Sequence, residues 1–187
     1  MYRREILMVI LITGLVFGFY FIYLFGKIFF WDNTVFEEEK IYIYIDEGYD
    51  FMELKSILTP YLKSISDFTI AAKKKDYINR VKPGKYLLLK GSNNNDIINT
   101  LRSKSLTVRV TFNNQERLED LAGRIAQQVA ADSTALIKAF LDPNFLDSKG
   151  FTKENILSMY LPNSYDFFWN TSAENFSNKM WSYYQRF

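Results

Sequence analysis

The chain has 187 residues, which is enough for one or two small domains. It contains no histidine and no cysteine, which excludes a Ser-His-Asp triad, a thiolate nucleophile, disulfides and zinc sites with cysteine ligands. The formal net charge is only +2, so the composition does not indicate a nucleic-acid partner. No phosphate-binding loop, dinucleotide fingerprint or metal-ligand spacing occurs, and we therefore expect neither a cofactor nor a metal.

The first predicted element is a membrane helix. Residues 6–25 form an uncharged, apolar run that is long enough to cross the hydrocarbon core of a bilayer as a helix. Two arginines, Arg3 and Arg4, precede the run, which predicts a cytoplasmic tail at 1–5 and export of the rest of the chain. The run is longer than the apolar core of a signal peptide, so we expect an uncleaved transmembrane signal anchor over 6–30.

Bulky aromatic residues end this anchor. Phe29, Phe30 and Trp31 are of the kind that forms an aromatic belt at a membrane interface. A short charged spacer follows them.

Residues 40–104 predict a small α+β module. Alternating Ile and Tyr over 40–46 indicate a strand, and Asp50 can cap the helix that follows. A second helix from Ser66, a strand after a Pro-Gly turn, and a third helix complete the order strand, helix, helix, strand, helix. We expect the third helix to be capped by Asn94 or Asn95.

Residues 105–187 predict one strand followed by helices. The strand covers 105–112, with Leu106, Val108, Val110 and Phe112 inward. Helical spacing follows over 113–130 and 132–142, and a helix over 153–160 would be capped by Thr152. A capping box of Thr171 and Glu174 predicts the last helix. Its buried stripe would comprise Phe176, Met180, Tyr183 and Phe187.

Three stretches in this order resemble the MltG/YceG-like endolytic murein transglycosylases, and their forms look most like the Bacteroidetes-type branch. They are "VKPGKYLLLKGSNNNDIINTLRS", "LTVRVTFNNQERLEDLAGRIAQQ" and "LPNSYDFFWNTSAENFSNKM". The resemblance implies an α+β chain with one N-terminal transmembrane helix, a LysM-like module over 38–104, and the start of a mixed α/β YceG-like catalytic domain over 105–187. It also implies that the chain is the N-terminal portion of a longer protein.

The resemblance also implies a chemistry. Enzymes of this family cleave the MurNAc–GlcNAc β-1,4 bond of nascent peptidoglycan strands and leave 1,6-anhydro-MurNAc ends, which terminates elongation. One carboxyl group acts as acid and then as base, and its pKa must be raised for it to be protonated near neutral pH. The implied location is the inner membrane, with the main domain in the periplasm. The implied partners are glycan strands and cell-wall synthases.

The family's catalytic glutamate position falls on Leu157, which cannot transfer a proton. A nearby carboxylate could substitute for it, this branch could use different chemistry, or the chain could be inactive. Two carboxylates fit by location. Asp166 lies among aromatic residues that would desolvate it, although Asp also commonly serves turns. Glu154 lies one helical turn before Leu157, although it equally suits a helix start.

Four residues near the same segment are candidates for substrate binding. Asn163 and Ser164 offer donors and acceptors for sugar hydroxyls, and they equally suit a turn. Tyr165 and Trp169 could stack on sugar rings, whereas the simpler reading of these aromatics is a hydrophobic core.

Two other functions compete with catalysis. One is a membrane-anchored protein of the cell-wall machinery that binds peptidoglycan, or acts as a scaffold, without cleaving it. The other is a signal-anchored protein of unrelated function that shares only the small α+β module.

Overall fold

The computed structural model describes residues 2–187 and divides into two compact units. Unit 1 holds the chain up to Ile43 together with 49–82 and 87–104. Unit 2 holds 105–187 together with two short pieces, 44–48 and 83–86. Both units mix helices with strands, as the element order of the sequence predicts.

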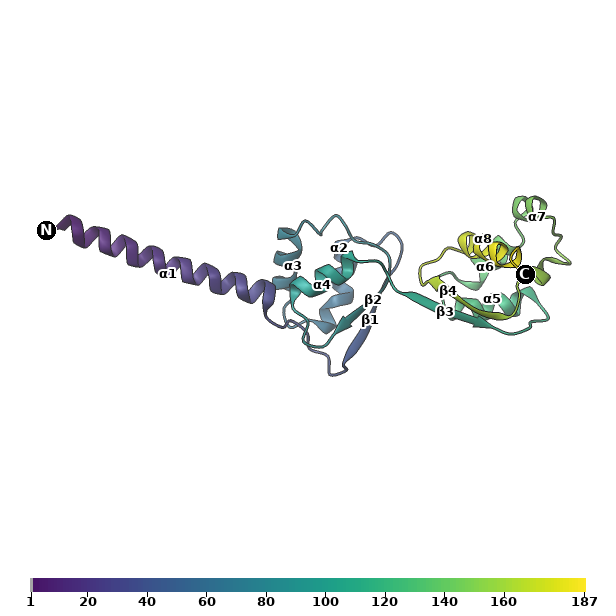
Figure 1. The fold of residues 1–187 in the computed structure, drawn as a ribbon, viewed down its shortest axis with the longest axis horizontal. Coiled ribbons are helices and arrows are strands. Elements are labelled where there is room, and N and C mark those ends of the chain that lie inside the picture. Colours follow the sequence, from purple (N-terminus) through teal and green to yellow (C-terminus); the bar gives the residue numbers. More distant parts are fainter. Residues whose placement is uncertain (1) are drawn as a thin grey trace. The chain divides into compact units, whose positions relative to one another are not determined.

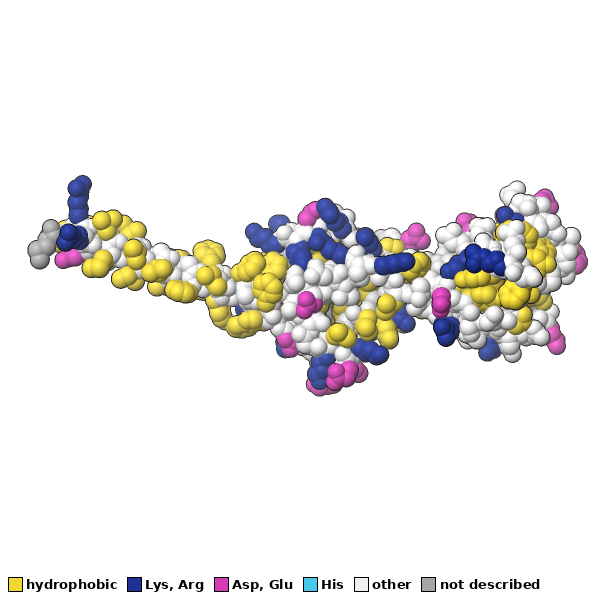
Figure 2. All heavy atoms as spheres, viewed as in Figure 1, with side chains coloured by type: hydrophobic (Ala, Val, Ile, Leu, Met, Phe, Trp, Pro, Cys, Tyr) yellow, Lys and Arg dark blue, Asp and Glu magenta, His cyan; other side chains and the backbone are white. Residues whose placement is uncertain are grey.

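The N-terminal helix α1 spans Tyr2–Phe30 and is continuous over 29 residues (Figure 1). Its best 18-residue window has a mean hydropathy of 2.4, and none of that window is buried within the protein. Hydrophobic side chains cover the helix along its length (Figure 2). The helix is therefore long and apolar enough to cross a membrane, which confirms the predicted apolar helix.

Unit 1 has the predicted strand, helix, helix, strand, helix order. After α1, its elements are β1 (Lys40–Ile45), α2 (Phe51–Leu58), a 3-10 turn η1 (Thr59–Tyr61), α3 (Ile65–Lys74), β2 (Gly84–Leu89) and α4 (Asn94–Arg102). β1 and β2 form a two-stranded sheet. The last residues of β1, 44–45, and the first residues of β2, 84–86, are grouped with unit 2.

Side-chain caps set the starts of the unit 1 helices. The Asp50 carboxylate accepts hydrogen bonds from the backbone N–H groups of Met52 and Glu53, and the Glu53 carboxylate accepts from the Asp50 N–H at 2.9 Å. This reciprocal pair is a capping box, and it confirms the predicted cap of α2. The cap of α4 is Asn93, which accepts from the Asp96 N–H, and not Asn94 or Asn95 as predicted.

The reason for that difference is that Asn94 is buried and has another role. Its side-chain amide donates to the carbonyl of Ile28 in α1 at 2.7 Å, and its carbonyl oxygen accepts from Asn33 Nδ2 at 2.7 Å. Asn33 also exchanges two hydrogen bonds with the backbone of Ser64. Only 1% of Asn94 and 5% of Asn33 are exposed, so this polar cluster is satisfied internally.

We expect Asn94→Ala to destabilise unit 1 by about 1–3 kcal/mol, because the carbonyl of Ile28 and the amide of Asn33 would each lose a buried partner. Urea unfolding of the detergent-solubilised chain measures this loss. Asn99→Ala on the exposed face of α4 is the matched control. It removes only a solvent-exposed hydrogen bond from Lys75, so it should change the free energy of unfolding by less than about 1 kcal/mol. Equal effects of the two substitutions would contradict this prediction.

Unit 2 is built on an antiparallel pair of strands. Its elements are β3 (Thr107–Phe112), α5 (Leu118–Ala126), α6 (Ser133–Phe140), α7 (Pro143–Lys149), a 3-10 turn η2 (Ile156–Met159), β4 (Asn163–Phe168) and α8 (Ala173–Tyr184). The register pairs Thr107 with Phe168 at one end and Phe112 with Asn163 at the other. Consequently the loop after β3 and the segment before β4 meet at the same end of this ribbon.

Several predicted elements of unit 2 need correction. β4 and α7 were not predicted, and 153–160 contains a 3-10 turn where we expected an α-helix. The cap of α8 is Ser172, whose hydroxyl accepts from the Asn175 N–H at 3.2 Å, and not Thr171. The Thr171 hydroxyl donates instead to the Phe168 carbonyl at the end of β4. Phe187 lies beyond the helix and is 85% exposed.

One hydrophobic cluster forms the core of unit 2. The inward faces of the ribbon contribute Val110, Phe112, Tyr165 and Phe167, and the helices α5, α6 and α8 pack against them. Leu106, predicted to be inward, precedes the strand and is 39% exposed. The core thus covers one face of the β3–β4 ribbon and leaves the other face to solvent.

Candidate functional site

An open groove of about 390 Å³ lies at the end of the ribbon where β3 finishes and β4 begins. The loop after β3 supplies three carboxamides, and the segment before β4 supplies a carboxylate and apolar side chains. The lining comprises Asn113, Asn114, Gln115, Leu121, Glu154, Asn155, Leu157, Ser158, Tyr160, Leu161 and Pro162. Amides and hydroxyls around an apolar floor are typical of sites that bind polar, uncharged ligands such as sugars.

The groove brings Glu154 and Leu157 together, as the sequence spacing suggested, although the connecting backbone is a turn and not an α-helix. Glu154 is the one carboxylate in the lining. Two hydrogen bonds lower the pKa of Glu154 below its ordinary value. The larger effect comes from the Thr152 side chain, and the smaller comes from the backbone N–H of Glu154 itself. The Glu154 carboxyl is therefore ionised at neutral pH when the groove is empty.

Replacing Thr152 by valine tests this cause. We expect the pKa of Glu154 to rise, because the side-chain hydrogen bond is lost while the Thr152 N–H keeps its bond to Asn155 Oδ1. A depressed carboxyl pKa stabilises the fold above the unfolded pKa, and this contribution disappears as pH falls through the folded value. Carboxyl ¹³C titration of the two proteins measures the change, with Glu154→Gln assigning the signal. Identical titration curves would contradict the prediction.

Asp166 lies on the solvent face of the ribbon, outside this groove. Residues adjacent in a strand point to opposite faces, so Tyr165 and Phe167 enter the core while Asp166 points outward. Its side chain is 62% exposed and faces Arg109 across the ribbon, with Nε 3.7 Å from Oδ1. The expectation that its aromatic neighbours desolvate Asp166 is therefore wrong.

The predicted binding residues separate in the structure. Asn163 is exposed at the groove end of β4, next to Pro162, and Ser164 shares a 2.7 Å hydrogen bond with Thr111 across the ribbon. Tyr165 is only 5% exposed; its hydroxyl donates to the Leu161 carbonyl at 2.7 Å. Tyr165 supports the groove wall from within the core and has no face available for stacking on a sugar.

Trp169 follows β4 at the opposite end of the ribbon from Asn163, about 20 Å away along a six-residue strand. Its carbonyl accepts from the Ala130 N–H at 2.8 Å, and its ring packs edge-on against Tyr44, which is also grouped with unit 2. Trp169 is partly exposed beside a second depression that includes Arg109 and Gln128. It therefore cannot line the same groove as Glu154.

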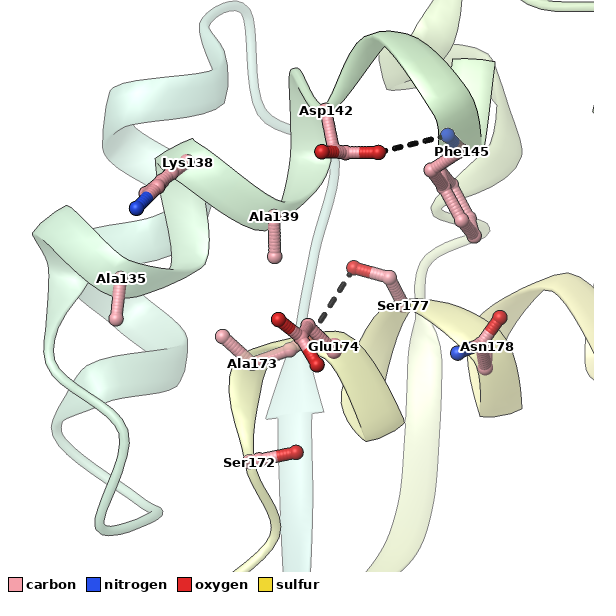
Figure 3. A pocket seen from close by; sticks show the side chains of 10 residues that line it. All are labelled: Ala135, Lys138, Ala139, Asp142, Phe145, Ser172, Ala173, Glu174, Ser177 and Asn178. Carbon is pink, nitrogen blue, oxygen red and sulfur yellow. Dashed lines mark hydrogen bonds between the residues drawn. The ribbon is translucent and has the colours of Figure 1, made fainter. Parts of the chain in front are cut away.

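A further hollow of about 560 Å³ lies between α6, α7 and α8 (Figure 3). Its polar groups serve the local helices. Asp142 caps α7 by accepting from the Phe145 N–H, and Ser177 donates to the Ala173 carbonyl at 3.2 Å. None of the predicted site residues lines it, so we take the groove beside Leu157 as the candidate site.

Sequence reasoning missed the carboxamides of the site. Asn113, Asn114 and Gln115 directly follow a predicted strand, and polar residues at strand ends are a usable signal. Their closeness to Glu154 depends on β4, which was not predicted. Among residues 2–187, no group of three or more acidic, His or Cys side chains could hold a metal ion.

The model of the YceG-like family matches residues 43–187. A crystal structure of a YceG-like protein from Listeria monocytogenes aligns with 80% of this chain and 55% of its own, at 20% identity and a TM-score of 0.41. The chain thus spans about half the length of that protein. No curated protein sequence matches the chain.

Proposed function

Because the chain belongs to the YceG-like family, we propose that it acts as an endolytic murein transglycosylase. Its substrate is the MurNAc–GlcNAc β-1,4 bond of nascent glycan strands, and its products are strands with 1,6-anhydro-MurNAc ends. The observation that carries this proposal is the groove beside Leu157, which combines the three carboxamides of the loop after β3, an apolar floor and the carboxyl group of Glu154.

Glu154 is the proposed acid and base. Its protonated carboxyl donates a proton to the glycosidic oxygen as the bond from that oxygen to C1 of MurNAc breaks. The resulting carboxylate takes the proton of the C6 hydroxyl as O6 bonds to C1. No water is consumed, and one carboxyl group serves both steps, in contrast to the two-carboxylate hydrolases.

The carboxyl of Glu154 is ionised in the empty groove, and binding of the substrate changes the surroundings of this group so that it can become protonated. A glycan strand lying in the groove displaces water from the Glu154 carboxyl, which raises its pKa. The nearby Leu121, Leu157 and Leu161 supply the apolar surroundings for this rise. Asn113, Asn114 and Gln115 bind the hydroxyl and acetamido groups of the sugars.

The remaining proposals follow the family pattern. Helix α1 anchors the protein in the inner membrane by a single pass, with a cytoplasmic N-terminus and both units in the periplasm. The strand, helix, helix, strand order of unit 1 supports a LysM-like, glycan-binding role for 38–104, and 105–187 contributes to the catalytic domain. Cell-wall synthases are the proposed protein partners, and the branch is Bacteroidetes-type.

One observation favours a second function, a membrane-anchored peptidoglycan-binding or scaffold protein. Leucine occupies the family's acid position, and Glu154 and Asp166 are both exposed carboxylates. A protein with this groove could hold a glycan strand without cleaving it.

Incubation of the full chain in bilayers with uncrosslinked glycan strands distinguishes the two functions. The transglycosylase predicts new 1,6-anhydro-MurNAc ends, which mass spectrometry identifies because they lack one water relative to hydrolysed ends. Retention of strands in a pull-down without new anhydro ends supports the binding function. If the protein neither produces anhydro ends nor retains strands, both functions are overturned.

A further inference from the structure

Helix α1 is joined to the rest of unit 1 by direct contacts. The carbonyl of Ile28 accepts the buried Asn94 amide at 2.7 Å, and Lys27 lies 3.7 Å from the Asp67 carboxylate of α3. Both α3 and α4 pack against α1. These contacts lie within the last turn of α1, so α3 and α4 are held close to that end of the helix.

The length of α1 places these contacts at the level of the lipid headgroups. A helix of 29 residues is about 43 Å long, compared with about 30 Å for the hydrocarbon core and 40–45 Å including headgroups. If α1 crosses the bilayer, Lys27 and Ile28 lie in the outer headgroup region. The parts of unit 1 that contact them lie there too.

Both ends of α3 are held near this level. Asp67, in its first turn, faces Lys27. At its other end, the Lys75 amine donates to Asn95 Oδ1 and Asn99 Oδ1 of α4, and Asn95 is the neighbour of the residue that binds Ile28. These contacts keep both ends of α3 close to the end of α1, which favours an orientation of α3 along the surface of a bilayer that α1 crosses.

The exposed face of α3 has the composition of a membrane-surface helix. Ser66, Ile70, Lys73 and Lys74 are exposed at spacings of four, seven and eight residues, which share one helix face, whereas Phe68, Ala71 and Ala72 are fully buried on the other. Ile70, about one turn before the two lysines, is 44% exposed. Figure 2 shows Lys and Arg side chains gathered over the part of unit 1 next to α1.

The charges on this face are available to a ligand. Lys63 is paired with Asp32 at 2.7 Å and Lys27 with Asp67, but no salt bridge in the described part of the chain involves Lys73 or Lys74. Each lysine near an anionic bilayer surface strengthens the binding of a protein to that surface by about fivefold. Two such lysines together strengthen the attraction between the helix and the surface by about 30-fold.

We propose that this α3 face, defined by Lys73, Lys74 and Ile70, lies on the outer surface of the membrane and binds the phosphates of anionic lipid headgroups. Ile70 inserts between the headgroups while the two ammonium groups contact phosphates. The inference requires α1 to cross the bilayer and does not depend on glycan cleavage.

The cysteine-free sequence makes a site-specific test direct. Two variants are prepared, each with a single cysteine that carries a nitroxide label. One is Ile70→Cys on α3, and the other is Met52→Cys in α2, where Met52 is 63% exposed. The full chain is placed in nanodiscs with or without phosphatidylglycerol, and collision with a water-soluble nickel complex reports exposure. We expect the label at 70 to be several-fold less accessible than the label at 52 in anionic discs, and 1 M NaCl to reverse this, because the Debye length is then about 3 Å.

A double charge reversal, Lys73→Glu with Lys74→Glu, should remove the protection of label 70. The control Lys138→Glu with Lys153→Glu changes the net charge equally on exposed sites of unit 2 and should leave the protection intact. Equal accessibility of the labels at 70 and 52 in anionic discs would overturn the inference. Alkaline carbonate extraction tests the anchor itself: release of the chain overturns both the anchor and the surface, whereas glycan cleavage is scored separately.

Discussion

Glu154→Gln is expected to lower the release of 1,6-anhydro-MurNAc ends by about 10²–10⁴-fold, the usual contribution of a general acid–base group. Glutamine keeps the size and hydrogen-bonding capacity of Glu154 but cannot donate a proton to the glycosidic oxygen. The side chain is exposed in the groove, so the substitution should not affect folding. Time courses with defined glycan strands, analysed by mass spectrometry, measure the rate.

The matched control is Asp166→Asn. Asp166 points away from the groove and pairs with Arg109, so its loss should change the rate by no more than a few-fold. An inactive Asp166→Asn together with an active Glu154→Gln would transfer the acid–base role to the solvent face of the ribbon. Retained strand binding by Glu154→Gln separates lost chemistry from lost affinity.

Phe176→Ala is expected to destabilise unit 2 by about 3–5 kcal/mol, which is a large part of the 5–15 kcal/mol typical of a folded domain. Phe176 is fully buried, stacks on Phe167 at a centroid distance of 4.4 Å and contacts Phe140 at 6.3 Å. Its removal leaves a cavity where α8 packs on α6 and the ribbon. Urea unfolding monitored by circular dichroism measures the loss.

Phe187→Ala is the control for this substitution. Phe187 is 85% exposed, so the same change of side chain should alter the free energy of unfolding by less than about 0.5 kcal/mol. Similar effects at both positions would mean that α8 does not hold the core of unit 2.

The groove illustrates where sequence reasoning succeeded and where it stopped. The proximity of Glu154 to Leu157 follows from three residues of spacing, which a helix and a 3-10 turn both satisfy. The proximity of Glu154 to Asn113 depends on strand pairing over about fifty residues of sequence. Because the sequence analysis does not predict β4, it does not predict that neighbouring side chains in 163–168 point to opposite faces. Asp166 is therefore expected among aromatic residues that in fact lie on the other face.

The caps show the same limit on a smaller scale. Asp50 was predicted correctly because its capping box involves only groups within three residues. The sequence predicts a cap at Asn94 or Asn95, because it cannot reveal that Ile28 and Asn33 are the partners of a buried Asn94 side chain. The cap of α4 is instead Asn93, one residue before Asn94.

The amino-acid sequence alone was enough to predict the apolar helix at the N-terminus, the strand and helix order of unit 1 and the family of the chain. These depend on local periodicity, uninterrupted hydropathy and short motifs, all of which are properties of neighbouring residues. Three features could be seen only in the folded chain. They are the carboxylate that shares a groove with the carboxamides, the burial of Tyr165 in the core, and the position of α3 beside the end of α1. These features depend on strand register and on buried hydrogen bonds, which join residues distant in sequence. Packing of the whole chain selects one set of such pairings from the many that the sequence allows.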